Sequence, residues 1–123
     1  MPPNRLLLLF LCLAVSACGP RTLPPQSPLD TAANHYQRGL AGLAAADLAT
    51  AQREFERAQA LDPGFAGAFV GQALVAMEQG DFWRARQDVA RAVRADADFV
   101  DGYIALGRIA TAEGVERQYP ARE

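Results

Sequence analysis

The sequence repeats itself at a spacing of 34 residues, and this period constrains the possible folds more than any other feature of the chain. When the chain is shifted by 34 residues, positions 45–65 align with positions 79–99. The aligned pairs are Asp47 with Asp81, Leu48 with Phe82, Ala51 with Ala85, Phe55 with Val89, Ala58 with Ala92 and Phe65 with Phe99. The part of the chain from Asp30 onward has about 94 residues, too few for a large globular core. Stacking of repeated units would allow such a chain to bury its apolar surface.

The apolar residues of each repeat have helical spacing. Ala51, Phe55 and Ala58 lie at i, i+4 and i+7, and their aligned counterparts have the same spacing. The pattern predicts in each repeat a helix with one narrow apolar stripe, which we call the stripe helix of that repeat. The small alanines of the stripe allow close helix packing, and the bulky residue between them fills the gap. The preceding helices carry matching small residues, again 34 apart: Gly39, Ala73 and Gly107.

A proline marks the end of the first predicted stripe helix. Pro63 has no amide hydrogen and disfavours helical geometry at Asp62, so we expect the helix to end near Leu61. Ala97 occupies the equivalent position in the second repeat. The end of the second stripe helix is therefore expected to be less sharply defined than the end of the first.

The turns inside the repeats contain helix-capping residues. Asp47 and Asp81 precede the two stripe helices and are expected to cap them. Gly80 is expected to supply a positive φ in the second of these turns.

A 34-residue period with small residues at fixed places resembles the tetratricopeptide repeat, in which each unit is a pair of antiparallel helices. The segment YIALG, residues 103–107, is similar to the first-helix pattern of that family. The resemblance implies an all-α fold, a short right-handed tetratricopeptide-type solenoid with two helix-pair repeats and a C-terminal capping helix. Repeat 1 is assigned to residues 31–64, repeat 2 to residues 65–98, and the capping helix or partial third repeat with its tail to residues 99–123. The resemblance ends near Gly114, because the remaining segment is short and contains Pro120.

In this family the first helices line a concave groove, and the resemblance assigns eight residues to that face. Two triplets run i, i+4, i+7 and are 34 residues apart, and the third helix adds two residues. The predicted partner-binding groove consists of Tyr36, Leu40, Leu43, Val70, Leu74, Met77, Ile104 and Arg108. An apolar groove suits an amphipathic helix or an extended peptide of a protein partner. The alternative is that the groove is filled by the chain's own tail or by a second copy in a homo-oligomer.

The N-terminal segment has the layout of a secretory signal. Arg5 precedes the apolar run LLLLFLCLAV, which is too short for a permanent transmembrane helix. VSAC, residues 15–18, resembles a bacterial lipobox. The sequence thus predicts a signal peptide over residues 1–17 and lipidation of Cys18, and the alternative is an ordinary cleaved signal with a stray cysteine.

The lipobox resemblance implies a covalent diacylglycerol and an N-acyl chain such as palmitate on Cys18, with no other cofactor. Because Gly19 follows the cysteine instead of an aspartate, we expect a lipid-anchored protein of the bacterial outer membrane that faces the periplasm, with the inner membrane as the less favoured site. Residues 18–30 are rich in proline and form either a spacer or a leader without a spacing role.

The residue inventory argues against catalysis. After Asp30 the chain has no serine, cysteine or lysine, and His35 is its only imidazole, which we interpret as a helix-packing residue and not as a metal ligand. Glu54 with Arg57 and Asp88 with Arg91 are interpreted as surface i, i+3 pairs. From Cys18 onward there are 11 arginines and 14 acidic residues, a net charge of −3 that argues against nucleic acid as a partner.

These observations predict a non-enzymatic, lipid-anchored protein–protein interaction module or scaffold of the bacterial cell envelope. The family resemblance implies a role in the assembly of pili or secretion systems. The alternative function is that of a self-associating structural envelope lipoprotein without a peptide ligand. An envelope hydrolase would require catalytic residues from a partner chain.

Overall fold

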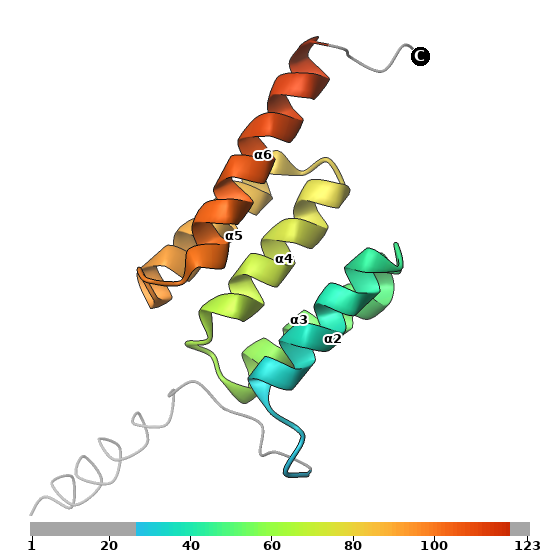
Figure 1. Cartoon of the computed structure of the whole chain (residues 1–123), viewed down its shortest axis with the longest axis vertical. Helices are drawn as coiled ribbons and strands as arrows, with labels where there is room; N and C mark the ends of the chain where they lie inside the picture. Colours follow the sequence, from blue (N-terminus) through green and yellow to red (C-terminus); the bar gives the residue numbers. More distant parts are fainter. Residues whose placement is uncertain (1–26, 119–123) are drawn as a thin grey trace, which may run out of the picture.

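The computed structural model describes residues 27–118, which form five α-helices and no strand (Figure 1). The helices are α2 (Ala32–Ala44), α3 (Leu48–Leu61), α4 (Ala66–Glu78), α5 (Phe82–Ala95) and α6 (Val100–Gln118). The expected all-α class is therefore confirmed over the described residues. The predicted signal peptide, the lipobox with Cys18, most of the proline-rich segment and the tail from residue 119 lie outside this range.

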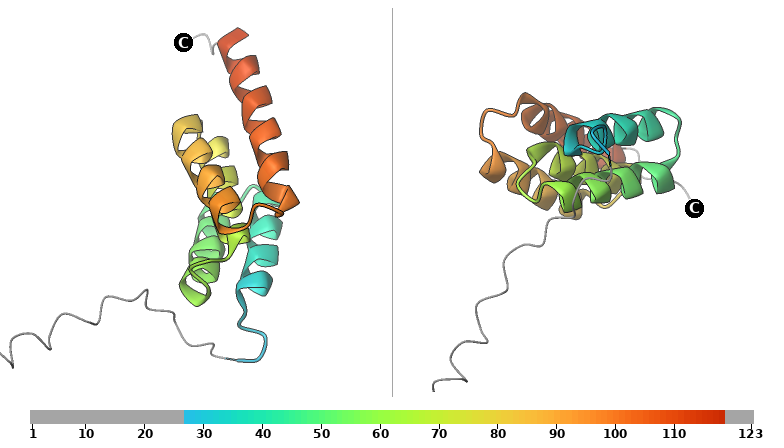
Figure 2. Two further views of the ribbon diagram at one scale, coloured as in Figure 1. Left: turned by 90° about the vertical axis from the view of Figure 1, so that its left-hand side faces the viewer. Right: turned by 90° about the horizontal axis from the view of Figure 1, so that it is seen from below.

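The helices pack as pairs that are adjacent in the sequence. α2 packs on α3 and α4 on α5, while α6 packs against both α4 and α5. Figure 1 shows α2, α4 and α6 side by side in one layer, with α3 and α5 behind them, and Figure 2 shows the two layers from the side and from below. α4 is the central helix, and residues 66–76 are all buried.

Each stripe helix begins directly after the aspartate that the sequence analysis selected as its cap. Asp47 accepts a hydrogen bond from the amide of Thr50 at 2.9 Å, and Asp81 accepts one from the amide of Arg84 at 3.0 Å. A carboxylate at this position satisfies an amide of the first turn that has no partner within the helix. Gly80 has the predicted positive φ of 77°, and the equivalent residue of the first repeat, Ala46, also has a positive φ, of 56°.

The two junctions between units have the same local geometry although only one contains proline. α3 ends at Leu61, as predicted, and its C-cap Asp62 accepts a hydrogen bond from the amide of Gly64 at 3.0 Å. In the second junction Asp96 accepts the equivalent bond from the amide of Asp98 at 2.9 Å. The aspartate side chain, which forms the same turn in both places, is the shared determinant of the junction.

The predicted stripes are the centres of the hydrophobic core. The stripe residues are all completely buried: Ala51, Phe55, Ala58, Ala85, Val89 and Ala92. Gly39 of α2 and Gly71 of α4 face the ring of Phe55, and a Cβ atom at either glycine would overlap that ring. The small residue at position 39, which the repeat identified, thus permits the close approach of Phe55, whereas Gly71 was not identified from the sequence.

Within the described residues the third unit consists of the single helix α6. α6 continues without interruption to Gln118, beyond the positions at which α2 and α4 end. Gly107 does not occupy a close contact as Gly39 does, because a Cβ atom there would meet nothing within 4 Å. Of the helices between residues 27 and 118, none combines the length and the apolar character that crossing a membrane requires.

Candidate functional site

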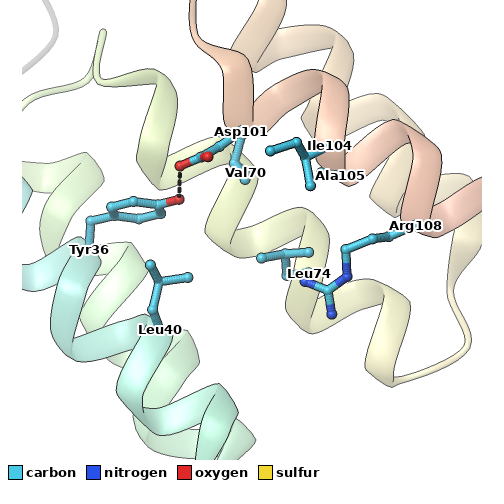
Figure 3. A pocket seen from close by; sticks show the side chains of 8 residues that line it. All are labelled: Tyr36, Leu40, Val70, Leu74, Asp101, Ile104, Ala105 and Arg108. Carbon is cyan, nitrogen blue, oxygen red and sulfur yellow. Dashed lines mark hydrogen bonds between the residues drawn. The ribbon is translucent and has the colours of Figure 1, made fainter.

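A hollow of about 160 Å³ lies between α2, α4 and α6 (Figure 3). Its lining residues are Tyr36, Leu40, Val70, Leu74, Asp101, Ile104, Ala105 and Arg108. Six of the eight residues predicted for the groove are therefore brought together. A second hollow of about 260 Å³ continues along Leu40 and Leu74 and adds Leu43, which was predicted, and Glu78, which was not. Met77, the remaining predicted residue, lines neither of these two hollows.

The floor of the hollow belongs to the core. Tyr36, Val70 and Leu74 are only 6%, 1% and 5% exposed. Ile104, on the wall formed by α6, is 54% exposed, and Leu40 is half-buried. A ligand would thus contact the edges of the floor residues and most of the side chain of Ile104.

An aromatic cluster supports the α2 side of the hollow. The ring of Tyr36 packs edge-on against Phe65 and Phe99, with centroids 5.8 Å and 6.3 Å away, and also contacts Phe55. Edge-to-face packing is a favourable arrangement for aromatic rings. Phe65 and Phe99 are aligned residues of the two unit junctions, so the repeat places equivalent aromatic side chains on the same tyrosine.

A hydrogen bond between α2 and α6 closes one end of the hollow. The Tyr36 hydroxyl donates to Oδ2 of Asp101 at 3.0 Å, as Figure 3 shows. Burial raises the pKa of the Tyr36 hydroxyl well above its usual range, and the hydrogen bond to Asp101 and the charge of that carboxylate raise it further. Asp101 is not among the residues that the sequence analysis assigned to the groove. The repeat gave no signal for its role, because Ala33 and Gly67 occupy the equivalent positions.

The chemistry of the lining is suited to binding. The rim has a carboxylate at Asp101 and a guanidinium at Arg108, one on each side of Ile104 along α6 (Figure 3). The remaining lining side chains are apolar apart from the Tyr36 hydroxyl, which is already engaged with Asp101. The hollow can accept an apolar group and place opposite charges near its two ends.

His35 is buried in α2, in agreement with its interpretation as a helix-packing residue, and both of its ring nitrogens make polar contacts. Its Nδ1 lies 2.6 Å from Oε2 of Glu54, and its Nε2 lies 2.6 Å from Oδ1 of Asp30. Arg57 donates to Asp30 at 2.5 Å. The predicted pairing of Glu54 with Arg57 is thus replaced by contacts of both residues with the start of α2 and the segment that precedes it.

The second repeat has a different arrangement at the same positions. Phe69 stands where the first repeat has His35, and Asp88 stands where it has Glu54. Asp88 accepts a hydrogen bond from Arg91 at 3.3 Å, as predicted, but it is buried and not on the surface, and its Oδ2 has no hydrogen-bond partner among the described residues. Burial raises the pKa of the Asp88 carboxyl, although Arg91 and Arg84 act in the opposite direction. The guanidinium of Arg91 lies 4.6 Å from the centre of the Phe69 ring.

The fold and the hollow together define a small all-helical protein built from stacked helix pairs. Comparison of the chain with protein-family models, with curated proteins and with solved structures found no match.

Proposed function

We propose that this chain is a non-enzymatic binding module with a short tetratricopeptide-type solenoid, and that the hollow between α2, α4 and α6 holds a segment of a protein partner. The observation that carries the proposal is the convergence of predicted groove residues from all three helices on one hollow. The 34-residue period and the helix-pair packing support the assignment to a tetratricopeptide-type architecture.

The ligand that fits best is one large apolar side chain of an amphipathic helix or extended peptide. A cavity of about 150 Å³ accommodates a benzene-sized group, and the hollow has about that volume. Asp101 and Arg108 favour a basic residue of the peptide near the first and an acidic residue near the second. Recognition by an apolar anchor with flanking charges is a common mode of peptide binding.

The proposed setting is the bacterial cell envelope. The apolar run after Arg5 and the VSAC segment support export and lipidation at Cys18, and Gly19 supports sorting to the outer membrane. With two or more acyl chains the module would remain at the membrane surface that faces the periplasm. A scaffold or assembly factor for an envelope machine such as a pilus or secretion system fits this placement.

The test uses two groove residues that are not fully buried. Ile104→Arg is made at the exposed wall, and Leu40→Arg at a half-buried position that lines both hollows. Leu74 is unsuitable because it is 5% exposed, and an arginine there would unfold the domain. Trp83→Arg, at a 70% exposed position of α5 in the other layer, is the matched control.

Each variant is expressed in full length, purified from detergent-solubilised envelopes and compared for co-purifying proteins by mass spectrometry, with helicity checked by circular dichroism. We expect the groove variants to lose a protein that the wild type and Trp83→Arg retain. Equal recovery by all four proteins would contradict the proposal. Light scattering provides a second test. A molecular mass that rises with concentration in the wild type but not in Ile104→Arg would also contradict the proposal, because the groove would then be filled by a second copy.

A further inference from the structure

The third unit presents a helix face that the first two units bury. Tyr103, Gly107 and Ala110 of α6, which we call the outer face of α6, are all exposed, and Tyr103 is 52% exposed. The equivalent residues of the first two units are all buried: His35, Gly39 and Gly42 in α2, and Phe69, Ala73 and Ala76 in α4. The equivalent helix face is therefore buried in the first two units and exposed in the third.

The stripe helices provide the cover in the first two units. A Cβ atom at Gly39 would overlap the ring of Phe55, and one at Gly42 would lie 3.0 Å from the backbone nitrogen of Ala51. In the second unit Ala73 and Ala76 share one core cluster with Ala85 and Val89 of α5. At Gly107 a Cβ atom would meet nothing within 4 Å, so the position that receives a bulky side chain in the other units is open.

α6 does not form the hairpin that would cover its own outer face. In the first unit α2 is followed by a turn at residues 45–47, and in the second unit α4 is followed by a turn at residues 79–81. The equivalent residues 113–115 are helical within α6. A second helix cannot follow α6 by the tight turn that the two complete units use.

We infer that the outer face of α6 is a docking site for an amphipathic helix of another polypeptide, which takes the place of the stripe helix of the third unit. This inference concerns a different surface from the groove and does not depend on the proposed function. The two internal copies define the chemistry of the partner. Its helix has a bulky apolar residue over Gly107, small residues four positions before and three positions after it, and an arginine two positions after it.

The expected arginine of the partner helix is inferred from Tyr103, the aromatic residue of the outer face. In the second unit the bulky Val89 is followed two residues later by Arg91, whose guanidinium lies 4.6 Å from the centre of the Phe69 ring. Tyr103 is the aromatic counterpart of Phe69, and its ring is open to a cation in the same way. A partner with this pattern would thus bury its apolar stripe and place its cation over Tyr103.

A second copy of the chain is a poorer occupant than another protein. The stripe residues of α3 and α5 are completely buried within their own units. A second copy could offer either stripe only by opening one of its own helix pairs, which would sacrifice as much contact as it gained.

The probe for this site is a peptide with the sequence of residues 81–96, which comprises α5 with both of its capping aspartates. The labelled peptide is titrated into the full chain in detergent and its fluorescence anisotropy is recorded. We expect saturable binding of this peptide and none of a Val89→Asp peptide. In the full chain, Gly107→Leu fills the open position and is expected to weaken binding by about tenfold or more, which corresponds to about 1.4 kcal/mol.

Gly107→Ala is the matched control because alanine is the equivalent residue, Ala73, in the second unit, where it shares a core cluster with Val89. It should change binding by less than about threefold, and both substitutions point into open space, so the fold should be unaffected. As a second measurement, the peptide is joined to the C-terminus by a flexible linker, which raises its effective concentration to about millimolar. The fusion should raise the melting temperature of the wild type and of Gly107→Ala but not that of Gly107→Leu.

Absence of an effect in both the titration and the fusion would overturn the inference, as would equal effects of the leucine and alanine variants. Loss of peptide binding in Ile104→Arg with full binding in Gly107→Leu would place the peptide in the groove and would also overturn it. Self-association that Gly107→Leu abolishes would identify a second copy as the occupant and reject another protein.

Discussion

The ring of Phe55 fills the space beside Gly71 so completely that a Cβ atom at this glycine would overlap the ring. Gly39 faces the same ring from α2 with the same result. In the second unit the smaller Val89 shares its core cluster with Ala73 and Ala105, the counterparts of the two glycines. The repeat thus pairs a large stripe residue with two glycines and a smaller one with two alanines.

This size matching predicts strong coupling between positions 55 and 71. Phe55→Val alone opens a cavity and should destabilise the protein by up to about 3 kcal/mol. Gly71→Ala alone overfills the site and should cost about 1–3 kcal/mol. In the double variant the methyl group introduced at position 71 occupies space vacated by the ring, so chemical denaturation should show a coupling energy of about 0.5–3 kcal/mol in the favourable direction.

Gly107→Ala combined with Phe55→Val is the control for this cycle. A Cβ atom at Gly107 meets nothing within 4 Å, so these two effects should add. If the effects at positions 55 and 71 also add within about 0.5 kcal/mol, the two sites pack independently and the predicted coupling is wrong.

The period and the stripes could be predicted from the sequence because they depend on local rules. Helical spacing identified Phe55 and Ala58 as core residues, and the proline rule placed the end of α3 at Leu61. The capping roles of Asp47 and Asp81 also follow from their position immediately before an apolar helix. Each of these statements involves residues within one helix or one turn.

The contacts between units could not be predicted in this way. Tyr36 and Asp101 are 65 positions apart, and Asp101 has no counterpart in the other units, so neither the period nor helical spacing indicates their hydrogen bond. The hydrogen-bond partners of His35 could not be predicted for a related reason. Asp30 and Glu54 lie in a preceding segment and in another helix, so the helical spacing around His35 does not indicate them.

Ala46 has a backbone conformation that is unfavourable for alanine. Its φ of 56° is in the left-handed region, which its counterpart Gly80 occupies without a side-chain penalty. Ala46→Gly should stabilise the protein by about 0.5–1 kcal/mol, or raise the melting temperature by about 4–8 °C per kcal/mol. Ala45→Gly is the control, because Ala45 has a φ of −85° and gains nothing from glycine. Equal shifts for the two variants in thermal unfolding would exclude relief of this strain.

Asp88 should make the protein less stable as the pH rises. Burial raises the pKa of its carboxyl in the folded state above the ordinary value of 3.8, so its contribution to stability is complete below that value and is lost as the pH increases through the folded pKa. Asp88→Asn removes the charge, and we expect it to melt at a higher temperature than the wild type at pH 7. The advantage should disappear as the pH approaches 4 in the same buffer series. Glu116→Gln, at an exposed carboxylate of α6, is the control, and a pH-independent effect of Asp88→Asn would contradict this account.

Tyr36→Phe isolates the hydrogen bond that links α2 with α6. Removing the hydroxyl deletes the bond to Asp101 and should cost about 0.5–1.5 kcal/mol, while Tyr103→Phe at an exposed position should have almost no effect. Burial raises the pKa of Tyr36 above its ordinary value of 10.0, so its stabilising contribution is present below pH 10 and is lost as the pH rises further. Tyr36→Phe should therefore show a smaller loss of stability between pH 9 and pH 11 than the wild type. Identical alkaline unfolding curves would reject the role of this hydroxyl.

The two cysteines provide a paired test of the predicted membrane anchor. Cys18 stands at the end of the VSAC segment, whereas Cys12 lies inside the apolar run that the predicted cleavage removes. Cys18→Ala should accumulate as an uncleaved precursor without lipid, because the alanine side chain has no thiol to accept a diacylglycerol group. Cys12→Ala should mature normally, since alanine preserves the apolar character of the run. Metabolic labelling with a palmitate analogue and the electrophoretic mobility of the two variants measure lipidation and cleavage separately. Normal cleavage of Cys18→Ala would indicate an ordinary signal peptide, and the protein would then be released from the membrane.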